Sequence, residues 1–233
     1  MTRTSGTTPR WLAERRAVLA AAREMGERGL VTGMAGNVSM RLPVTRGRAL
    51  IAVTPSQRPY ATLRPEDIVV VDSVGTVVDG GLAPSSELPL HLAVYHARPD
   101  VGAVMHTHST YASVLAVVGR ALPPVLDELV VFVGGAVEVA EYGMSGTREM
   151  AERAVRALGD RKAAFLRNHG LVGVGSTPAD ALGVCAMVER AAQVYVMASL
   201  LGGARVLPPD VVRKERKLFR ARQADKGDSR GRA

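Results

Sequence analysis

The chain has 233 residues, 47% of them hydrophobic and 22% charged, which is enough apolar material for one domain with a buried core. Aromatic residues make up only 4%, which argues against the rows of stacking side chains that bind single-stranded nucleic acid. The single cysteine, Cys185, excludes an intrachain disulfide and a multi-cysteine zinc site, while the net charge of +8 raises the question of an acidic partner.

The N-terminal half predicts one helix followed by several strands. Residues 1–9 lack the apolar h-region of a signal peptide, and we expect them to be flexible. Apolar residues at helical spacing predict a helix over 9–28, and short apolar runs predict strands over 36–41, 49–54, 68–72 and 76–79. Residues 84–87 then open a second helix that ends near Arg98.

The C-terminal half alternates strands with helices. We predict strands over 102–108, 136–142, 163–166 and 171–175, and helices over 109–118, 146–158 and 177–201. The last of these helices contains the most apolar stretch, but Glu189, Arg190 and Gln193 interrupt it, so we predict no membrane span. These features are typical of a cytoplasmic protein.

The basic charge is concentrated at the C-terminus. Residues 213–233 contain nine basic and three acidic residues, so this segment carries six of the eight net charges. Such a segment is usually a solvated, frayed helix end. We therefore predict one domain over 10–203, a basic, flexible tail over 204–233, and no nucleic-acid-binding face.

The order of elements predicts an α/β fold in which helices cover one mixed sheet. Strands that come in pairs are followed by strands that alternate with helices. Strict βαβ alternation is absent, and so is a Gly-rich dinucleotide turn with its acidic partner. These absences argue against a Rossmann oxidoreductase.

Three histidines lie at the ends of predicted strands. His106 and His108 close the run VGAVMHTH, and the period of two in a strand puts both rings on one face, close enough to chelate one ion. His169 directly follows an apolar run and precedes a glycine. A His-x-His pair often occurs by chance, so a metal site at these three histidines needs a fourth ligand.

Glu87 is the candidate for that partner. It lies in the first turn of a helix, where the macrodipole favours its charged form. Three imidazoles and one carboxylate suit a borderline divalent ion such as Zn²⁺, which can polarise a carbonyl and stabilise an enediolate. His91 and His96 lie on the same helix, and we interpret both as structural.

Three short segments are rich in hydroxyl, amide and glycine residues at element ends, namely 35–39, 54–57 and 84–87. Each alone is an ordinary turn or helix cap. Together they can supply backbone N–H groups and hydroxyls to a phosphate, with Ser85 and Ser86 at a helix N-terminus.

The whole set resembles the class II aldolase/adducin-head family, and within it the L-fuculose-1-phosphate aldolases. The matching motifs are AGNVS at 35–39, TPSQRPY at 54–60, PSSE at 84–87, HTH at 106–108 and NHG at 168–170. Their order and spacing agree over about residues 10–203. Together they form a far more specific signature than any one of them does.

The resemblance implies a three-layer αβα fold with a mixed, largely antiparallel sheet. It also implies a homotetramer with active sites at subunit interfaces, and Zn²⁺ (or Mn²⁺ or Co²⁺) held by His106, His108 and His169. Glu87 would be a fourth ligand at rest and the base during catalysis. Phosphate binding would fall to six residues: Gly36, Asn37, Ser56, Gln57, Ser85 and Ser86. The implied reaction cleaves a phosphorylated sugar, a ketose 1-phosphate, to dihydroxyacetone phosphate and an aldehyde.

The sequence departs from the family pattern at three positions. One lies in the predicted phosphate-binding segment 54–57, and two concern the residues that would contact the aldehyde part of the substrate. Gln57 stands where the family commonly has glycine, which is costly if φ is positive there. The family tyrosine after the Pro-containing loop aligns with Asp127, next to Glu128, and the C-terminal tail has no tyrosine. The expected substrate is therefore L-fuculose 1-phosphate or a smaller 5-deoxypentulose 1-phosphate, with Asp127 and Glu128 as candidate catalytic residues.

Two other functions stay open at this point. Relatives in the family decarboxylate keto-acid phosphates or aromatic diacids with the same metal, and that reaction needs no tyrosine acid. An adducin-like scaffold is the non-catalytic alternative. That reading predicts degraded metal ligands, whereas this chain retains all of them.

Overall fold

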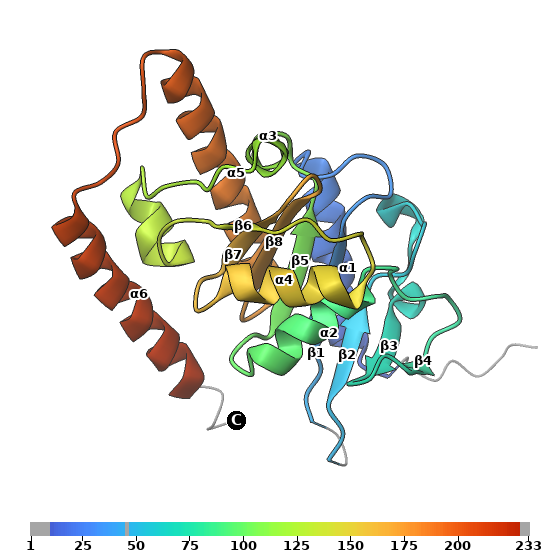
Figure 1. Ribbon diagram of the computed structural model, residues 1–233. Coiled ribbons are helices and arrows are strands. Elements are labelled where there is room, and N and C mark those ends of the chain that lie inside the picture. The colour runs from blue at the N-terminus through green and yellow to red at the C-terminus, as the bar shows by residue number, and fades with distance from the viewer. Residues whose placement is uncertain (1–9, 45–46, 229–233) are drawn as a thin grey trace, which may run out of the picture.

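A computed structural model describes residues 10–44 and 47–228 (Figure 1). Within these residues, eight strands form one sheet in the order β4-β3-β2-β1-β5-β8-β7-β6. All neighbours are antiparallel except β6 and β7. The strands are β1 Asn37–Arg41, β2 Leu50–Val53, β3 Val69–Asp72, β4 Val77–Asp79, β5 Ala103–Thr107, β6 Val139–Ala140, β7 Ala163–Leu166 and β8 Gly170–Gly175. The predicted mixed, largely antiparallel sheet is confirmed.

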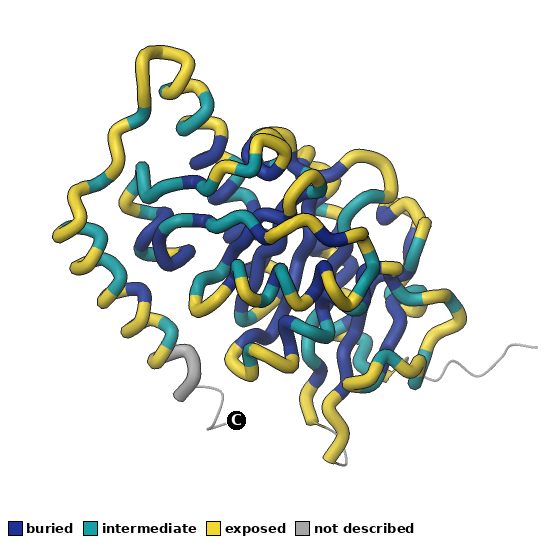
Figure 2. The backbone as a smooth tube through the Cα atoms, viewed as in Figure 1, coloured by how far each residue is buried: buried dark blue, intermediate teal, exposed yellow. Residues whose placement is uncertain are grey.

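Helices cover both faces of this sheet. On one face lie α1 (Leu12–Glu27), α3 (Thr110–Val118) and α5 (Pro178–Leu200), and on the other lie α2 (Leu88–Ala97) and α4 (Arg148–Leu158). Each helical layer has its own hydrophobic cluster against the sheet, and the buried backbone in Figure 2 is concentrated between the layers. The three-layer αβα architecture is therefore confirmed.

Alternation along β5 decides which way the histidines point. Ala103 and Met105 belong to the cluster under α1, α3 and α5, whereas Val104 belongs to the cluster under α2 and α4. Side chains two residues apart in a strand share a face. His106 therefore faces the α2 side of the sheet, as Val104 does.

Helix α5 is long and apolar enough to cross a membrane by length and composition alone. In the structure it packs against β5, β8, α1 and α3. Both carboxylate oxygens of Glu189 accept hydrogen bonds from the first turn of α3, from the backbone N–H groups of Tyr111 and Ala112, each at 2.9 Å. A charge at that helix N-terminus complements its dipole. The buried residues of α5 lie in its first part, between Pro178 and Ala192.

The C-terminal segment differs from the expectation of a flexible tail. Residues Pro209–Asp228 form helix α6, which packs on a short π-helical segment, η3 (Leu129–Val133). Phe219 is only 2% exposed and contacts Gly134, while Asp160 pairs with Arg216 at 2.9 Å and with Arg220 at 3.6 Å. A charge count does not register one buried aromatic ring, which explains why the sequence pattern favoured a solvated tail.

Two further outcomes concern the ends of elements. The strand predicted over 136–142 is shorter in the structure, where only Val139–Ala140 pairs with β7. The flexible N-terminus predicted over 1–9 lies outside the described residues, as do residues 229–233.

Candidate functional site

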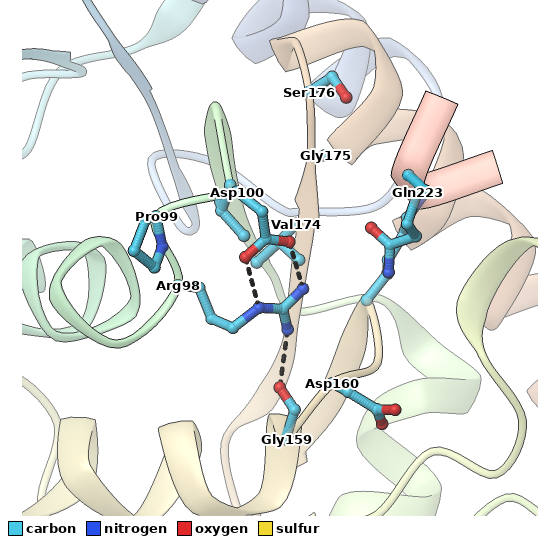
Figure 3. A pocket seen from close by; sticks show the side chains of 12 residues that line it. Arg98, Pro99, Asp100, Gly159, Asp160, Val174, Gly175, Ser176 and Gln223 are labelled. Atoms are coloured by element: carbon cyan, nitrogen blue, oxygen red, sulfur yellow. Dashed lines mark hydrogen bonds and ion pairs between the residues drawn. The ribbon is translucent and has the colours of Figure 1, made fainter. Parts of the chain in front are cut away.

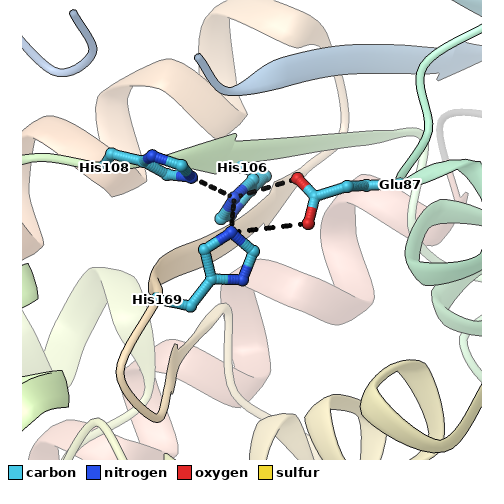
Figure 4. A group of neighbouring side chains, drawn as sticks. All are labelled: Glu87, His106, His108 and His169. Carbon is cyan, nitrogen blue, oxygen red and sulfur yellow. Dashed lines mark hydrogen bonds and ion pairs between the residues drawn. The ribbon is translucent and has the colours of Figure 1, made fainter. Parts of the chain in front are cut away.

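Four predicted ligand side chains converge at one end of the sheet (Figure 4). Their ligand atoms all lie within 4.8 Å of one another. The Nε2 atom of His106 lies 2.8 Å from Nε2 of His108 and 3.2 Å from Nε2 of His169. The carboxylate of Glu87 approaches His106 at 3.1 Å and His169 at 3.5 Å.

The fold explains why residues so far apart in the sequence meet there. His106 and His108 end β5, and β8 runs antiparallel beside it, so the turn that carries His169 lies next to the end of β5. Gly170 permits this approach, because a Cβ at that position would lie 2.2 Å from the carbonyl oxygen of Thr107. Glu87 immediately precedes α2, the helix that covers this face.

The donor set fits a divalent metal ion. His106 Nδ1 lies 3.0 Å from the carbonyl oxygen of Leu171. A ring that donates there from Nδ1 keeps the Nε2 lone pair for a ligand bond, which is the usual arrangement of metal-binding histidines. Tetrahedral zinc with bonds near 2.0–2.1 Å needs N···N separations of about 3.3 Å, close to the observed spacing. His106, His108, His169 and Glu87 would thus hold Zn²⁺, and Mn²⁺ or Co²⁺ would suit the same donors.

The shifted pKa values of these side chains favour metal binding. Burial, reinforced by His106 and His169, lowers the pKa of His108 to about 4, and burial likewise lowers the pKa of His169. Burial alone would raise the pKa of Glu87, but His106 and His169, together with a hydrogen bond from Ser145, hold it far below its ordinary value. At pH 7, His108 and His169 are therefore neutral and the Glu87 carboxylate is ionised.

Two side chains hold the Glu87 carboxylate, one on each oxygen. Asn37 donates from Nδ2 to Oε2 at 2.9 Å, and Ser145 donates from Oγ to Oε1 at 2.7 Å. Ser145 lies in the loop before α4, 58 residues from Glu87. The sequence analysis missed Ser145, since a serine in a loop carries no local signal of such a partner.

The three predicted anion-binding segments form a pocket beside these ligands. An isolated β-bridge joins Pro55 to Pro84, Ser56 N donates to Ala83 O at 3.0 Å, and Ser85 N donates to Thr54 O at 3.1 Å. The pocket has a volume of about 220 Å³. Its lining includes all six predicted phosphate residues, three of the ligands and Ser145: Gly36, Asn37, Ser56, Gln57, Ser85, Ser86, Glu87, His108, His169 and Ser145.

Two backbone positions shape the pocket. Gly36 has φ of 73°, and a Cβ there would lie 2.6 Å from Val31 Cγ1 and 2.7 Å from the carbonyl oxygen of His106, so only glycine fits. Gln57, which stands where the resembled family commonly has glycine, has φ of 54°. That conformation is left-handed and costs a residue with a Cβ about 1–2 kcal/mol.

Comparison with known proteins identifies the family. Residues 16–196 match the model described as the class II aldolase and adducin N-terminal domain. The chain belongs to the class II aldolase and adducin family. Together with the complete set of ligand side chains, this makes it a class II aldolase, a metal-dependent carbon–carbon lyase.

Several relatives of this class II aldolase match along most of their length. It is 36% identical over 206 residues to the 5-deoxy-D-ribulose 1-phosphate aldolase of Bacillus thuringiensis serovar kurstaki, covering 88% of this chain and 95% of the relative. It is 35% identical over 181 residues to the L-fuculose phosphate aldolase of Escherichia coli K12, covering 78% and 81%. A solved structure of an L-fuculose 1-phosphate aldolase matches with a TM-score of 0.84 at 32% identity, covering 92% and 98%.

Asp127, which aligns with the family tyrosine, and its neighbour Glu128 lie away from the pocket of this aldolase. Asp127 is exposed and faces Glu215 of α6, whose pKa is raised by burial and by Asp127. Glu128 pairs with Arg190 of α5. Neither lines the pocket in the described chain. Their catalytic roles stay predictions, which require a neighbouring subunit.

The other two histidines of α2 are not ligands in the cluster. His91 is fully buried and lies 2.5 Å from Asn37 Oδ1 and 2.6 Å from Ser39 Oγ. His96 is exposed near the end of α2. The sequence analysis interpreted both as structural, and the contacts of His91 give that residue a place directly behind the site.

A larger cavity, of about 680 Å³, lies at the opposite end of the strands (Figure 3). It is bordered by the start of β5, the end of β8 and part of α6. Arg98 crosses it, donating to Asp100 at 2.7 and 2.8 Å and to the carbonyl oxygen of Gly159 at 2.7 Å. Its charged groups are already paired, so the smaller pocket beside the ligands is the candidate active site.

Proposed function

We propose that this class II aldolase cleaves a 5-deoxypentulose 1-phosphate to dihydroxyacetone phosphate and acetaldehyde, with L-fuculose 1-phosphate as the alternative substrate. One observation carries the proposal: the cluster of three histidines and Glu87 borders the pocket formed by the proposed phosphate-binding loops, and Glu87, His108 and His169 line that pocket. The near-complete coverage of the Bacillus thuringiensis relative favours the deoxypentulose.

The loops would hold the phosphate. Ser56, Ser85 and Ser86 offer hydroxyls at the pocket wall, and the backbone at Gly36 and Gln57 turns there with positive φ. Hydroxyls and backbone N–H groups in such turns bind phosphate oxygens without a cationic side chain. Fixing the phosphate orients the sugar carbonyl toward the histidines.

A divalent metal bound by the histidines would polarise the sugar carbonyl and stabilise the negative charge that develops on the adjacent oxygens. When the bond between C3 and C4 breaks, the electron pair stays on C3 and the C4 oxygen becomes the aldehyde. Glu87 belongs to the ligand cluster and is ionised at rest. It would therefore take up a proton from solvent and pass it to C3, giving dihydroxyacetone phosphate. Its contacts with Asn37 and Ser145 keep both carboxylate oxygens in place.

The proton of the C4 hydroxyl needs a separate acceptor. We propose a cytoplasmic homotetramer in which Asp127 or Glu128 of a neighbouring subunit approaches the pocket. Both residues lie just before η3 and away from the pocket of their own chain. An acidic residue there would replace the tyrosine expected from the family resemblance.

Product analysis with the zinc-loaded protein tests the reaction. We expect 5-deoxyribulose 1-phosphate to give dihydroxyacetone phosphate and acetaldehyde, and a chelator to abolish both. L-fuculose 1-phosphate, a keto-acid phosphate and a dihydroxyphthalate complete the panel. Release of carbon dioxide without dihydroxyacetone phosphate would contradict the proposal and identify a decarboxylase.

Replacement of Glu87 tests its role in the reaction. Glu87→Gln preserves the shape of the side chain and three histidine ligands, so we expect it to retain zinc and lose about 10²–10⁴-fold in turnover, the usual range for general acid–base catalysis. Zinc content by elemental analysis and turnover are measured together. Full activity in the zinc-loaded variant would remove Glu87 from the proposed role.

A further inference from the structure

A row of buried polar side chains runs between strand β1 and helix α2, directly behind the candidate active site. Alternate residues of β1 meet residues spaced by four along α2. Together they form what we call the β1–α2 ladder: Asn37 and Ser39 on the strand, and Glu87, His91 and Tyr95 on the helix side. Two strand residues advance about 6.6 Å and four helix residues about 6 Å. The two rows therefore stay in register.

Hydrogen bonds connect the ladder from end to end. Asn37 Nδ2 donates to Glu87 Oε2 at 2.9 Å, and Asn37 Oδ1 lies 2.5 Å from His91 Nε2. On the other side of the ring, His91 Nδ1 lies 2.6 Å from Ser39 Oγ, which lies 2.8 Å from the Tyr95 hydroxyl. His91 and Ser39 are fully buried, and Asn37 and Tyr95 are 4% and 2% exposed. No bulk water competes for these contacts.

The charge on Glu87 determines the direction of every hydrogen bond in the ladder. A carboxylate only accepts, so Asn37 must turn its amide nitrogen toward Glu87 and its oxygen toward His91. His91 must then donate from Nε2, and a neutral ring accepts at Nδ1 from the Ser39 hydroxyl. Burial lowers the pKa of His91 to about 3, which keeps the ring neutral at pH 7. Burial also raises the pKa of Tyr95, whose hydroxyl remains a donor to Ser39.

We propose that His91 is a positioning residue: by holding the Asn37 amide in one orientation, it fixes the Glu87 carboxylate between the histidine ligands and the substrate pocket. Reversal of the amide would place Asn37 Oδ1 against the carboxylate and its NH₂ group against the His91 donor, so both contacts would be lost together. The inference rests on the proposed proton-carrying role of Glu87. An amide nitrogen has two hydrogens, so Asn37 retains one donor for the phosphate.

The first experiment measures exchange of a carbon-bound proton of dihydroxyacetone phosphate with solvent deuterium, by NMR, on zinc-loaded protein. This half-reaction requires Glu87 but no aldehyde, so it is independent of which sugar the enzyme cleaves. His91→Phe removes both ring hydrogen bonds, whereas His91→Gln can keep one donor and one acceptor. His96→Phe is the matched control, because it makes the same change at an exposed position of the same helix.

We expect His91→Phe to lower kcat for exchange by about 10–100-fold, the range typical of groups that orient metal ligands. KM and zinc content should stay within about twofold of wild type. His91→Gln should recover most of the lost rate, and His96→Phe should match wild type. Wild-type exchange in folded, zinc-loaded His91→Phe would overturn the proposal, and so would loss of zinc with kcat per bound zinc unchanged.

The Glu87→Gln variant separates the two proposals. If it exchanges protons at the wild-type rate, the proposed function of Glu87 fails. If Glu87→Gln is slow while both His91 variants are normal, the positioning role alone fails.

A second measurement needs no variant and therefore does not depend on folding of a mutant. Nitrogen-15 NMR of the histidine rings in the wild-type protein reports which nitrogen carries the proton. We expect His91 in the neutral Nε2–H tautomer, with and without zinc. A ring protonated at Nδ1 alone would reverse the ladder and overturn the proposal.

Discussion

The two halves of the pocket are built in different ways. The ligand half consists of side chains on or beside regular elements, with His106 on β5 fully buried and Glu87 only 6% exposed. The phosphate half consists of loops, in which Ser86 and Gln57 are exposed and the segments are joined through their backbones. In the first half the chemistry depends on particular side-chain atoms at fixed distances. In the second half, several hydroxyls and the remaining backbone N–H groups would share the proposed phosphate binding, so we expect single side chains to matter less.

The largest effect is expected in the ligand half, from His106→Ala. This change removes the imidazole that contacts both other histidines and Glu87. Loss of the metal should forfeit several kcal/mol of charge stabilisation, which is about a thousandfold in turnover. Elemental analysis should show loss of zinc, and a chelator should bring the wild type to the same level. Stoichiometric zinc with wild-type turnover would disprove the site.

A smaller effect in the same half is expected from Ser145→Ala. The Ser145 hydroxyl donates to Glu87, and a hydrogen bond to a charged group is worth about 1.5–3 kcal/mol. Because Asn37 still holds the other oxygen, we expect a loss near the lower limit, about tenfold in kcat. Ser199→Ala, on the exposed surface of α5, is the control. Equal kcat in the two variants would show that Glu87 does not depend on Ser145.

In the phosphate half, Ser86→Ala should act on binding more than on turnover. Its hydroxyl is one of several donors at the pocket wall, so we expect KM to rise roughly fivefold, equivalent to about 1 kcal/mol, with kcat unchanged. Ser73→Ala, in the exposed turn between β3 and β4, provides the comparison. A kcat loss as large as that of Ser145→Ala would erase the distinction between the halves.

The smallest expected effect is a gain in stability from Gln57→Gly. Gln57 has φ of 54°, and glycine relieves about 1–2 kcal/mol of strain there at an entropic cost of about 0.5–1 kcal/mol. The net gain of about 0.5–1 kcal/mol should raise Tm by about 2 °C for a chain of this length. Thermal unfolding of the zinc-loaded protein measures it. A lower Tm would mean that the Gln57 side chain makes a compensating contact.

Much of the site was predictable because its signals are periodic or positional. The strand spacing of His106 and His108, and the position of Glu87 at a helix start, follow from local geometry. The succession of helices and strands along the chain follows from apolar periodicity in the same way. The family resemblance predicted the three layers and the mixed sheet, but the pairing of β8 with β5 was not predicted, because no local pattern reports it.

What the sequence did not reveal depends on contacts between distant segments. Ser145 reaches Glu87 from a loop 58 residues away, and Phe219 anchors α6 on η3 as a single buried ring in a charged segment. The spacing of Asn37 and Ser39 against His91 and Tyr95 was visible in the sequence. The sequence does not show that β1 lies under α2, and this packing is what brings the two pairs of residues into hydrogen-bonding contact.

The contact between Glu189 and the start of α3 has a consequence for the order in which the protein forms. Ser109 provides no side-chain cap for α3, so the free N–H groups just beyond His108 are satisfied from a helix 77 residues further along. On a ribosome, strand β5 emerges well before Glu189 does. The HTH motif of a nascent chain is therefore synthesised early. The start of α3, which directly follows this motif, is anchored only when α5 packs against it, through a contact that forms only after α5 has been synthesised.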